Sequence, residues 1–346
     1  MRSKQRAAAL SAALTLLLAV TAAAKSGNKT GKSDEGASAK AKPVLWVQPD
    51  DIKARNLFYG PGGEAHAPHT TYTFDEEDMN GTSPKFIVHD ENGVKWKVKL
   101  AQEVHPETAA TRLVWAVGYS TNEDYYLPSM QVENMPPRLR RGQNFVGPAG
   151  TVHEVRLKRY LEGEKKIGNW RWRDNPFVGT KELSGLKVMM ALINNWDLKD
   201  SNNSVYHEKH PDGSDGPEDI YMVSDLGASF GTTGFSWTQK ISKGNLNSYR
   251  HSKFIRKATS DHVDFNVPTR ASLIHIFDPP EYWRRLTLLW IGKGIPRADV
   301  EWIAGLLEQL SPDQIRDAFR AAGYQPDEVE GFSKVVENRI AQLRDL

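Results

Sequence analysis

The sequence predicts an α+β fold in two lobes, with a small antiparallel sheet in the N-terminal lobe and a mainly helical C-terminal lobe. Short β-prone runs separated by Asn-Gly turns lie between residues 71 and 100, which is typical of β-hairpins. From residue 180 onward, apolar residues recur at helical spacing, and several helix-start signals follow. The Pro-, Gly- and Trp-rich stretch between these two regions places the predicted lobe boundary near residue 160.

Composition sets limits on the class of protein. The chain has 346 residues, of which 39% are hydrophobic and 25% are charged, as in an ordinary globular protein with a sizeable core. Its formal net charge is only +2, so no global field favours nucleic acid, and we expect no nucleic-acid partner. The chain contains no Cys, which excludes disulfides, thiolate catalysis and cysteine-ligated zinc.

The first 24 residues have the pattern of a signal peptide or an N-terminal anchor. Arg2, Lys4 and Arg6 precede an apolar run over residues 7–20, and three small residues follow at 22–24. This pattern predicts export to a bacterial periplasm or to the extracellular space. The alternative is a chain anchored in the membrane by residues 7–24, and a membrane partner is expected only in that case. The predicted organisation is therefore a signal or anchor (1–24), a disordered linker (25–43), an N-lobe (44–160) and a C-lobe (161–346).

One hairpin connection in the N-lobe has the residues of an anion-binding loop. Gly81 can bring backbone N–H groups close to an anion, the hydroxyls of Thr82 or Ser83 can add hydrogen bonds, and Lys85 adds positive charge. Asn-Gly hairpins without a ligand are also common, so the loop predicts a phosphate contact only in combination with other residues. The strands predicted around it cover residues 71–74, 86–89 and 94–100.

Three lysines alternate along the last of these strands. Lys95, Lys97 and Lys99 share one face, which ordinarily means exposure to solvent. Phosphoryl-transfer enzymes instead turn one such lysine towards the nucleotide phosphates and steady it with a glutamate from the next helix. Residues 106–118 read as that helix and supply Glu107. We predict Lys99 as the phosphate-binding lysine with Glu107 as its partner, and Lys97 as the alternative.

The C-lobe carries the most informative motifs. An apolar helix over residues 180–194 leads into a loop that contains Asp197 and, five places on, Asn202. Two short strands, 204–206 and 219–223, then lead to Asp225. A carboxylate beside the attacking hydroxyl, and an amide with a second carboxylate on Mg²⁺, are the groups that phosphoryl transfer requires. The segment from 231 to 270 mixes basic and aromatic residues, so it is either a docking surface for an acidic or sugar substrate or a packed irregular loop. Helices are predicted to begin near residues 280, 297 and 311.

These motifs resemble those of the protein-kinase-like superfamily. Asp197-Leu198-Lys199 with Asn202, and then Asp225-Leu226-Gly227, are similar to the HRDLKxxN and DFG elements of protein kinases. Asn195 before Asp197, the Gly81–Lys85 loop and the strand with Lys99 are closer in style to HipA-like and phosphatidylinositol-kinase-like kinases. The sequence departs from protein kinases in having Asn195 for His and Leu226 for Phe, and in lacking a GxGxxG loop and an APE-type element.

The resemblance implies a role for each matched residue. Asp197 would be the catalytic base and Lys199 would neutralise the transferring group, while Asn202 and Asp225 would hold Mg²⁺. Lys99 would bind the phosphates of ATP, with Glu107 orienting it. The predicted function is an ATP- and Mg²⁺-dependent phosphotransferase that acts on a hydroxyl of an unknown protein, lipid or saccharide. The alternatives are a catalytically inactive kinase-fold binding or scaffolding protein of the cell envelope, and an enzyme with another phosphorylated donor.

Overall fold

The computed structural model describes residues 41–69, 71–81, 83–208, 216–232, 243–267, 283 and 286–346. These residues contain both helices and sheets, which confirms the α+β class. The predicted signal segment and nearly all of the predicted linker, together with Thr82 and the start of the helix predicted near residue 280, lie outside them. In the described part of the chain, no helix combines the length and the apolar character that crossing a membrane requires.

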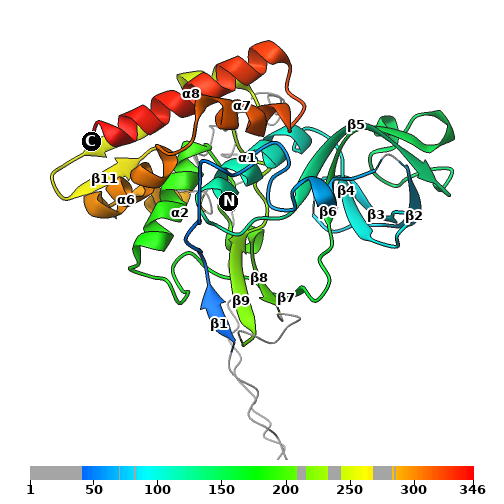
Figure 1. Cartoon of the computed structure of the whole chain (residues 1–346), viewed down its shortest axis with the longest axis horizontal. Coiled ribbons are helices and arrows are strands. Elements are labelled where there is room, and N and C mark those ends of the chain that lie inside the picture. Colours follow the sequence, from blue (N-terminus) through cyan, green and yellow to red (C-terminus); the bar gives the residue numbers. More distant parts are fainter. Residues whose placement is uncertain are drawn as a thin grey trace, which may run out of the picture. The chain divides into compact units, whose positions relative to one another are not determined.

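Five strands close into a barrel in the order β2-β3-β4-β6-β5 (Figure 1). Neighbouring strands run antiparallel except for β2 and β5, whose parallel pairing closes the barrel. Side chains that alternate towards the interior, such as Phe86, Trp96, Val98 and Leu157, form one hydrophobic cluster. The strands are β2 (Thr71–Glu77), β3 (Lys85–His89), β4 (Lys95–Lys99), β5 (Asp124–Glu133) and β6 (Thr151–Arg159).

The prediction of a small antiparallel sheet was therefore wrong in two respects: the sheet is closed, and one of its pairs is parallel. Strand β5, which was not predicted, supplies both differences. Pro128 interrupts its sequence, and a proline inside an apolar run argues against a strand. Its pairing with β2 joins residues about sixty positions apart, Tyr72 to Val132, and no local sequence pattern encodes such a contact.

Helix α1 (Val104–Ala116) follows β4 directly and contacts β5 and β6 of the barrel. It begins two residues before the predicted start at Pro106 and ends as predicted before Gly118. Gly118 has φ 99°, and a Cβ at this position would lie 2.3 Å from the carbonyl oxygen of Val47, so only glycine fits this helix end. Leu113 and its apolar neighbours on α1 pack into a second, larger hydrophobic cluster formed mainly by the later helices.

The two C-terminal motifs, around Asp197 and Asp225, adjoin the strands of a second sheet. Its order is β1-β9-β8-β7, with β1 parallel to β9 and the other pairs antiparallel. The hairpin of β8 and β9 was predicted, and both strands are longer than expected. The strands are β1 (Lys42–Val44), β7 (Lys165–Gly168), β8 (Asn203–Glu208) and β9 (Glu218–Val223).

The remaining helices contribute apolar side chains to the larger hydrophobic cluster. Helix α2 buries its predicted apolar stripe, and the predicted starts at Arg297 and Pro312 are confirmed. Ser311 caps α7 in a capping box with Gln314. The segment after residue 244 is not an irregular loop where it is described, because it contains α4, β10 and β11. The elements are α2 (Lys181–Leu192), α4 (Leu246–His251), β10 (Ile255–Ala258), β11 (His262–Phe265), β12 (Ile295–Pro296), α6 (Arg297–Leu307), α7 (Pro312–Arg320) and α8 (Pro326–Arg344).

Candidate functional site

Lys99 is the last residue of β4 and lies buried beneath helix α1. Alternation along the strand turns Trp96 and Val98 into the barrel core, so Lys97 and Lys99 lie on its outer face. Lys99 is only 4% exposed, whereas Lys95 is exposed and Lys97 is partly buried. Of the three alternating lysines, only Lys99 is therefore sequestered from solvent.

Two glutamates at the start of α1 hold the ammonium of Lys99. Its Nζ lies 2.7 Å from Oε2 of Glu107 and 2.5 Å from Oε2 of Glu103. Glu103 and Glu107 are four residues apart, so their side chains project from the same face of the helix start. The structure thus brings the predicted pair Lys99 and Glu107 into contact and adds Glu103 to it.

Arg156 on β6 extends these ion pairs into the barrel wall. It lies across from Lys99 in the β4–β6 register, donates from Nη2 to Oε1 of Glu107 at 3.0 Å, and donates from Nη1 to Oδ1 of Asp124 at 2.8 Å. Glu107 therefore has a cation on each carboxylate oxygen. All four side chains, Lys99, Glu107, Arg156 and Asp124, are buried, so charges alternate along a row that is shielded from water.

We expect Arg156→Ala to be strongly destabilising. The substitution leaves Glu107 and Asp124 buried without their shared cation, and breaking a buried ion pair on one side costs about 3–5 kcal/mol. The measurement is the free energy of unfolding in urea. Arg320→Ala is the control, since its pair with Asp317 is exposed and such pairs contribute at most about 1 kcal/mol. Equal losses for the two variants would contradict a structural role for the buried row.

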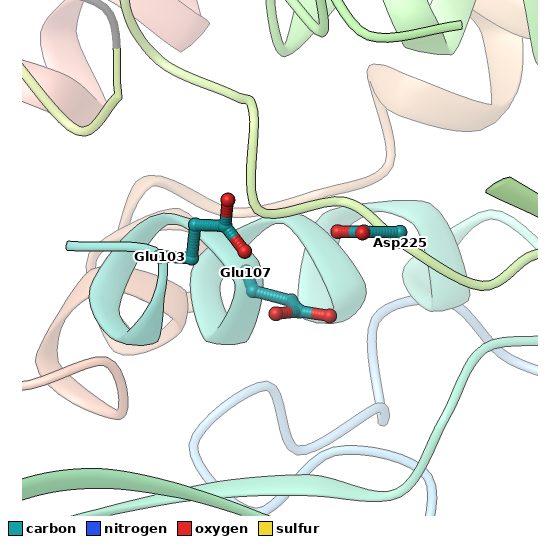
Figure 2. A group of neighbouring side chains, drawn as sticks. All are labelled: Glu103, Glu107 and Asp225. Atoms are coloured by element: carbon teal, nitrogen blue, oxygen red, sulfur yellow. The ribbon is translucent and has the colours of Figure 1, made fainter. Parts of the chain in front are cut away.

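Asp225 reaches the same ammonium from the turn after β9. Its Oδ1 lies 3.4 Å from Nζ of Lys99 and accepts a hydrogen bond from the N–H of Gly227 at 3.3 Å. Figure 2 shows Glu103 at the N-cap of α1, Glu107 on α1 and Asp225 on the neighbouring segment. One oxygen of each carboxylate lies within 4.8 Å of the others. Lys99 contacts all three carboxylates. The side chain of Asp225 is 44% exposed, so this carboxylate alone opens to solvent.

The electrostatics of this cluster favour the charged forms of Lys99 and Glu103, whereas burial raises the pKa of Glu107. Burial lowers the pKa of Lys99, but the carboxylates of Glu107, Asp225 and Glu103 outweigh burial and raise its pKa well above the ordinary value. Burial raises the pKa of Glu103, but Lys99 and Lys243 outweigh burial and hold its pKa well below the usual range. A permanently charged ammonium therefore sits beside an exposed carboxylate.

The loop after α2 fixes Asp197 through its backbone. Oδ1 of Asn195, which is fully buried, accepts a hydrogen bond from the N–H of Asp197 at 3.0 Å. Nδ2 of Asn202 donates to the carbonyl oxygen of Asp197 at 2.7 Å. The carboxylate of Asp197 remains 22% exposed and pairs with Lys199 at 3.0 Å. The step of five residues between Asp197 and Asn202 thus closes a compact loop that leaves the carboxylate of Asp197 partly exposed.

The hairpin register places this loop beside Asp225. Asn203 pairs with Val223, so Asn202 lies opposite Ser224, whose N–H donates to the carbonyl oxygen of Asn202 at 2.9 Å. The N–H of Trp196 also donates to the carbonyl oxygen of Ala228 at 3.2 Å. The two motifs around Asp197 and Asp225 therefore run side by side.

The Gly81 loop also reaches the lysine cluster. Gly81 has φ 66°, and the hydroxyl of Ser83 donates to Oε2 of Glu103 at 2.8 Å. Burial lowers the pKa of Lys85, and the nearby Lys99 lowers it further, against the effect of Asp78. Ser83 thus contacts the cluster through Glu103, Lys85 pairs with Lys99 in the β3–β4 register, and Gly81 lies beside Lys85. Thr82 lies outside the described residues.

Lys97, the alternative phosphate-binding lysine, is directed elsewhere. Its Nζ pairs with Oδ2 of Asp78 at 3.0 Å and lies 5.9 Å from the ring centroid of Tyr160. These contacts keep Lys97 on the outer barrel surface, away from Glu107. Of these two lysines, Lys99 is the one that contacts Glu107.

Sequence reasoning assigned no individual role to four charged residues around Lys99, namely Glu103, Asp124, Arg156 and Lys243. The spacing of four residues from Lys99 to Glu103 and from Glu103 to Glu107 was a readable signal for Glu103. Nothing in an alternating strand marks Arg156 as buried, because the burial depends on a helix from elsewhere in the chain. Lys243 belongs to the basic and aromatic segment 231–270 that was considered as a docking surface, but no local pattern marked it as a partner of Glu103, since that contact depends on the tertiary fold.

Comparison with known proteins gives loose structural neighbours. No family model and no curated protein matches the chain. A Helicobacter pylori proinflammatory kinase, CtkA, aligns with 12% identity and a TM-score of 0.39 over 80% of this chain and 96% of its own. The Golgi casein kinase with Mn and ADP bound aligns with 10% identity and a TM-score of 0.38 over 81% and 72%. Likenesses this loose transfer no activity, so the site alone supports the function proposed below.

Proposed function

We propose that this chain is a phosphotransferase that takes its phosphoryl group from a Mg²⁺–ATP complex and gives it to a hydroxyl group. The observation that carries the proposal is the meeting of Lys99 with Glu107 and with Asp225, which lies 126 positions further along the chain. The loop of Asp197 and Asn202 lies against the turn of Asp225. A helix-steadied lysine, a metal-binding carboxylate and amide, and a base are the recurring parts of phosphoryl transfer.

The lysine would bind the phosphates. Lys99 is held at a fixed position by Glu103 and Glu107 and stays charged because of its raised pKa. Its contact with Asp225 is the longest of its three ion pairs and the only one with an exposed partner. An incoming phosphate can therefore take the place of Asp225 on the ammonium without disturbing the buried pairs.

Asp225 and Asn202 would supply the oxygen ligands of a magnesium ion. Carboxylate and amide oxygens are the donors that Mg²⁺ prefers. The Nδ2 of Asn202 is used in the loop, which directs the other amide atom, Oδ1, away from the backbone of Asp197. A bound Mg²⁺ would neutralise charge on the transferring phosphoryl group.

Asp197 would act as the base. Its backbone is fixed on both sides, its carboxylate is partly exposed, and Lys199 stands 3.0 Å away. The acceptor oxygen forms the new bond to phosphorus, the bond to the leaving diphosphate breaks, and the acceptor proton moves to the carboxylate of Asp197. The ammonium of Lys199 can then move from the carboxylate of Asp197 to the transferring phosphoryl group and neutralise its charge.

A thermal-unfolding titration with ATP tests the proposal. The chain without its first 24 residues should be stabilised by ATP in the presence of Mg²⁺, by about 2.7 kcal/mol at a concentration one hundred times the dissociation constant. EDTA should remove that stabilisation. A chain that no nucleotide stabilises under either condition would contradict the proposal.

The choice between the two lysines gives a matched pair of variants. Lys99→Ala should weaken ATP binding about 10- to 100-fold, because it removes a charge-assisted contact of about 1.5–3 kcal/mol. Lys97→Ala should leave the affinity nearly unchanged, because its ammonium pairs with Asp78. Calorimetry on variants confirmed as folded by their unfolding midpoints provides the measurement. The reverse order of effects would show that Lys97 holds the phosphates.

A binding or scaffolding protein without transfer activity is the second candidate. The three ion pairs of Lys99 favour this candidate, because the carboxylate of Asp225 already pairs with the ammonium in the absence of a nucleotide. The two candidates differ in turnover. Phosphate transfer from radiolabelled ATP to protein, lipid or saccharide mixtures supports the enzyme, whereas nucleotide binding without transfer to any of them supports the binding protein.

We also propose that the chain folds into two lobes and that it is exported. The barrel has its own hydrophobic cluster, separate from the cluster around α2 and the later helices, as expected for two lobes. Because α1 packs its apolar face on the second cluster and its glutamates on the barrel, it would connect the lobes. Fractionation of cells that express the full chain would test the predicted export.

A further inference from the structure

Lys243 is a second ammonium beside the Lys99 cluster. It lies in the segment that follows the Asp225 turn, and its Nζ pairs with Oε1 of Glu103. The same Nζ lies 5.7 Å from the ring centroid of Trp196, which precedes Asp197. Its side chain is 21% exposed, so a solvent-borne ligand can reach it. Lys243 therefore stands between the start of α1 and the loop that carries Asp197.

Glu103 connects Lys243 to Lys99 and to the Gly81 loop. One carboxylate oxygen, Oε2, pairs with Nζ of Lys99 at 2.5 Å and accepts a hydrogen bond from the hydroxyl of Ser83 at 2.8 Å. The other oxygen, Oε1, pairs with Nζ of Lys243. Gly227 packs against the same side chain, since a Cβ there would lie 2.8 Å from Cβ of Glu103. The buried carboxylate of Glu103 thus binds donors from three separate segments of the chain, and the Glu103 side chain contacts a fourth segment at Gly227.

Three donors bind the carboxylate of Glu103, and a further lysine lies close to one of them. Lys99 and Lys243 lie on the two oxygens of one group. Lys85 pairs with Lys99 in the β3–β4 register, and the nearby ammonium of Lys99 lowers the pKa of Lys85. Ser83 adds a hydroxyl that can turn from Glu103 to another acceptor. Several ammonium groups with a hydroxyl beside a glycine loop are the donors that bind chains of phosphate groups.

We propose that Lys243 is a second phosphate-binding lysine and that Glu103 is the positioning residue that sets Lys243, Lys99 and Ser83 around one polyphosphate. This assignment rests on the proposed function and names residues of the same site. Lys99 would hold one phosphate from the barrel side, and Lys243 would hold another from the side of the Asp197 loop. The ligand class is a nucleoside triphosphate or another linear polyphosphate.

The first test compares Lys243→Ala with Lys334→Ala in the chain lacking residues 1–24. Affinities for Mg²⁺–ATP and for inorganic tripolyphosphate are measured by calorimetry. Lys243→Ala should weaken both about 10- to 100-fold, as expected for one charge-assisted contact, and Lys243→Arg should restore most of the affinity. Lys334 is an exposed lysine of α8 with its own acidic neighbour, Glu337, and its replacement should change neither affinity. Equal affinities for wild type and Lys243→Ala would overturn the assignment.

The second test uses the sign of the effect at Glu103. A carboxylate beside a bound anion repels it, so Glu103→Gln should strengthen polyphosphate binding if Glu103 were only a neighbour. If Glu103 positions the two lysines, its loss should weaken binding although a negative charge has been removed. Urea unfolding midpoints confirm that the compared variants are folded. Stronger binding in Glu103→Gln would contradict the positioning role.

The two probes separate failure of this assignment from failure of the proposed function. Tripolyphosphate binding that depends on Lys243, without Mg²⁺-dependent ATP binding or transfer, would keep the polyphosphate site and end the phosphotransferase proposal. Transfer from ATP that Lys243→Ala leaves at the wild-type rate and affinity would keep the phosphotransferase and end the role of Lys243. Absence of binding to both probes would overturn both.

Discussion

Asp197→Ala should lower the rate of phosphoryl transfer by about 10²–10⁴-fold while leaving ATP affinity nearly intact. The base acts on the acceptor hydroxyl and has no contact with the nucleotide in the proposed arrangement. The fold should tolerate the change, because the backbone of Asp197 is held by Asn195 and Asn202 rather than by its own carboxylate. The measurement is initial transfer rate together with calorimetric ATP affinity.

The matched control for this variant is Asp261→Asn. Asp261 is an exposed residue in the turn between β10 and β11, remote in sequence from the site motifs, so transfer should continue at the wild-type rate. Loss of ATP binding and transfer together in Asp197→Ala would show that Asp197 binds the metal or the nucleotide. Retention of full activity would show that another group takes the proton.

Asp225→Ala should abolish the Mg²⁺-dependent part of ATP binding. The carboxylate of Asp225 is the most exposed member of the Lys99 cluster and the only one in it that we assign to the metal. Without it, the stabilisation of about 2.7 kcal/mol expected from saturating Mg²⁺–ATP should fall to the level seen in EDTA. Thermal-unfolding titrations with ATP, with and without Mg²⁺, give the comparison.

The variant should unfold at nearly the wild-type midpoint in the absence of ligand, since a half-exposed ion pair contributes at most about 1 kcal/mol. Asp313→Ala, which changes an exposed carboxylate at the start of α7, should retain the full response to Mg²⁺–ATP. A response to Mg²⁺–ATP that persists in Asp225→Ala would place the metal elsewhere.

Local patterns predicted the parts of the fold that depend on neighbouring residues. The β-prone runs at β2, β3 and β4, the helix stop at Gly118 and the Ser311 cap all depend on residues a few positions apart. Lys99 and Glu107 were paired correctly because a strand followed at once by a helix fixes their geometry. The register of the β8–β9 hairpin brings Asn202 to Ser224 for the same local reason.

Features that depend on distant segments could not be predicted from the sequence. The parallel pairing of Tyr72 with Val132 closes the barrel, and no local pattern in either strand indicates which strand it pairs with. Arg156 reads as an ordinary polar position of an alternating strand, yet α1 covers it and makes it part of a buried row of charges. Lys243 reaches Glu103 across 140 positions of sequence, and only the folded chain shows that approach.

The most direct measurement is an experimental structure of the chain in complex with Mn²⁺ and a non-hydrolysable ATP analogue. The account predicts an anomalous manganese peak bound by the carboxylate of Asp225 and the amide oxygen of Asn202. It also predicts phosphate oxygens on the ammonium of Lys99, whose contacts with Glu103 and Glu107 persist. A nucleotide bound elsewhere, or a manganese peak that touches neither Asp225 nor Asn202, would contradict it.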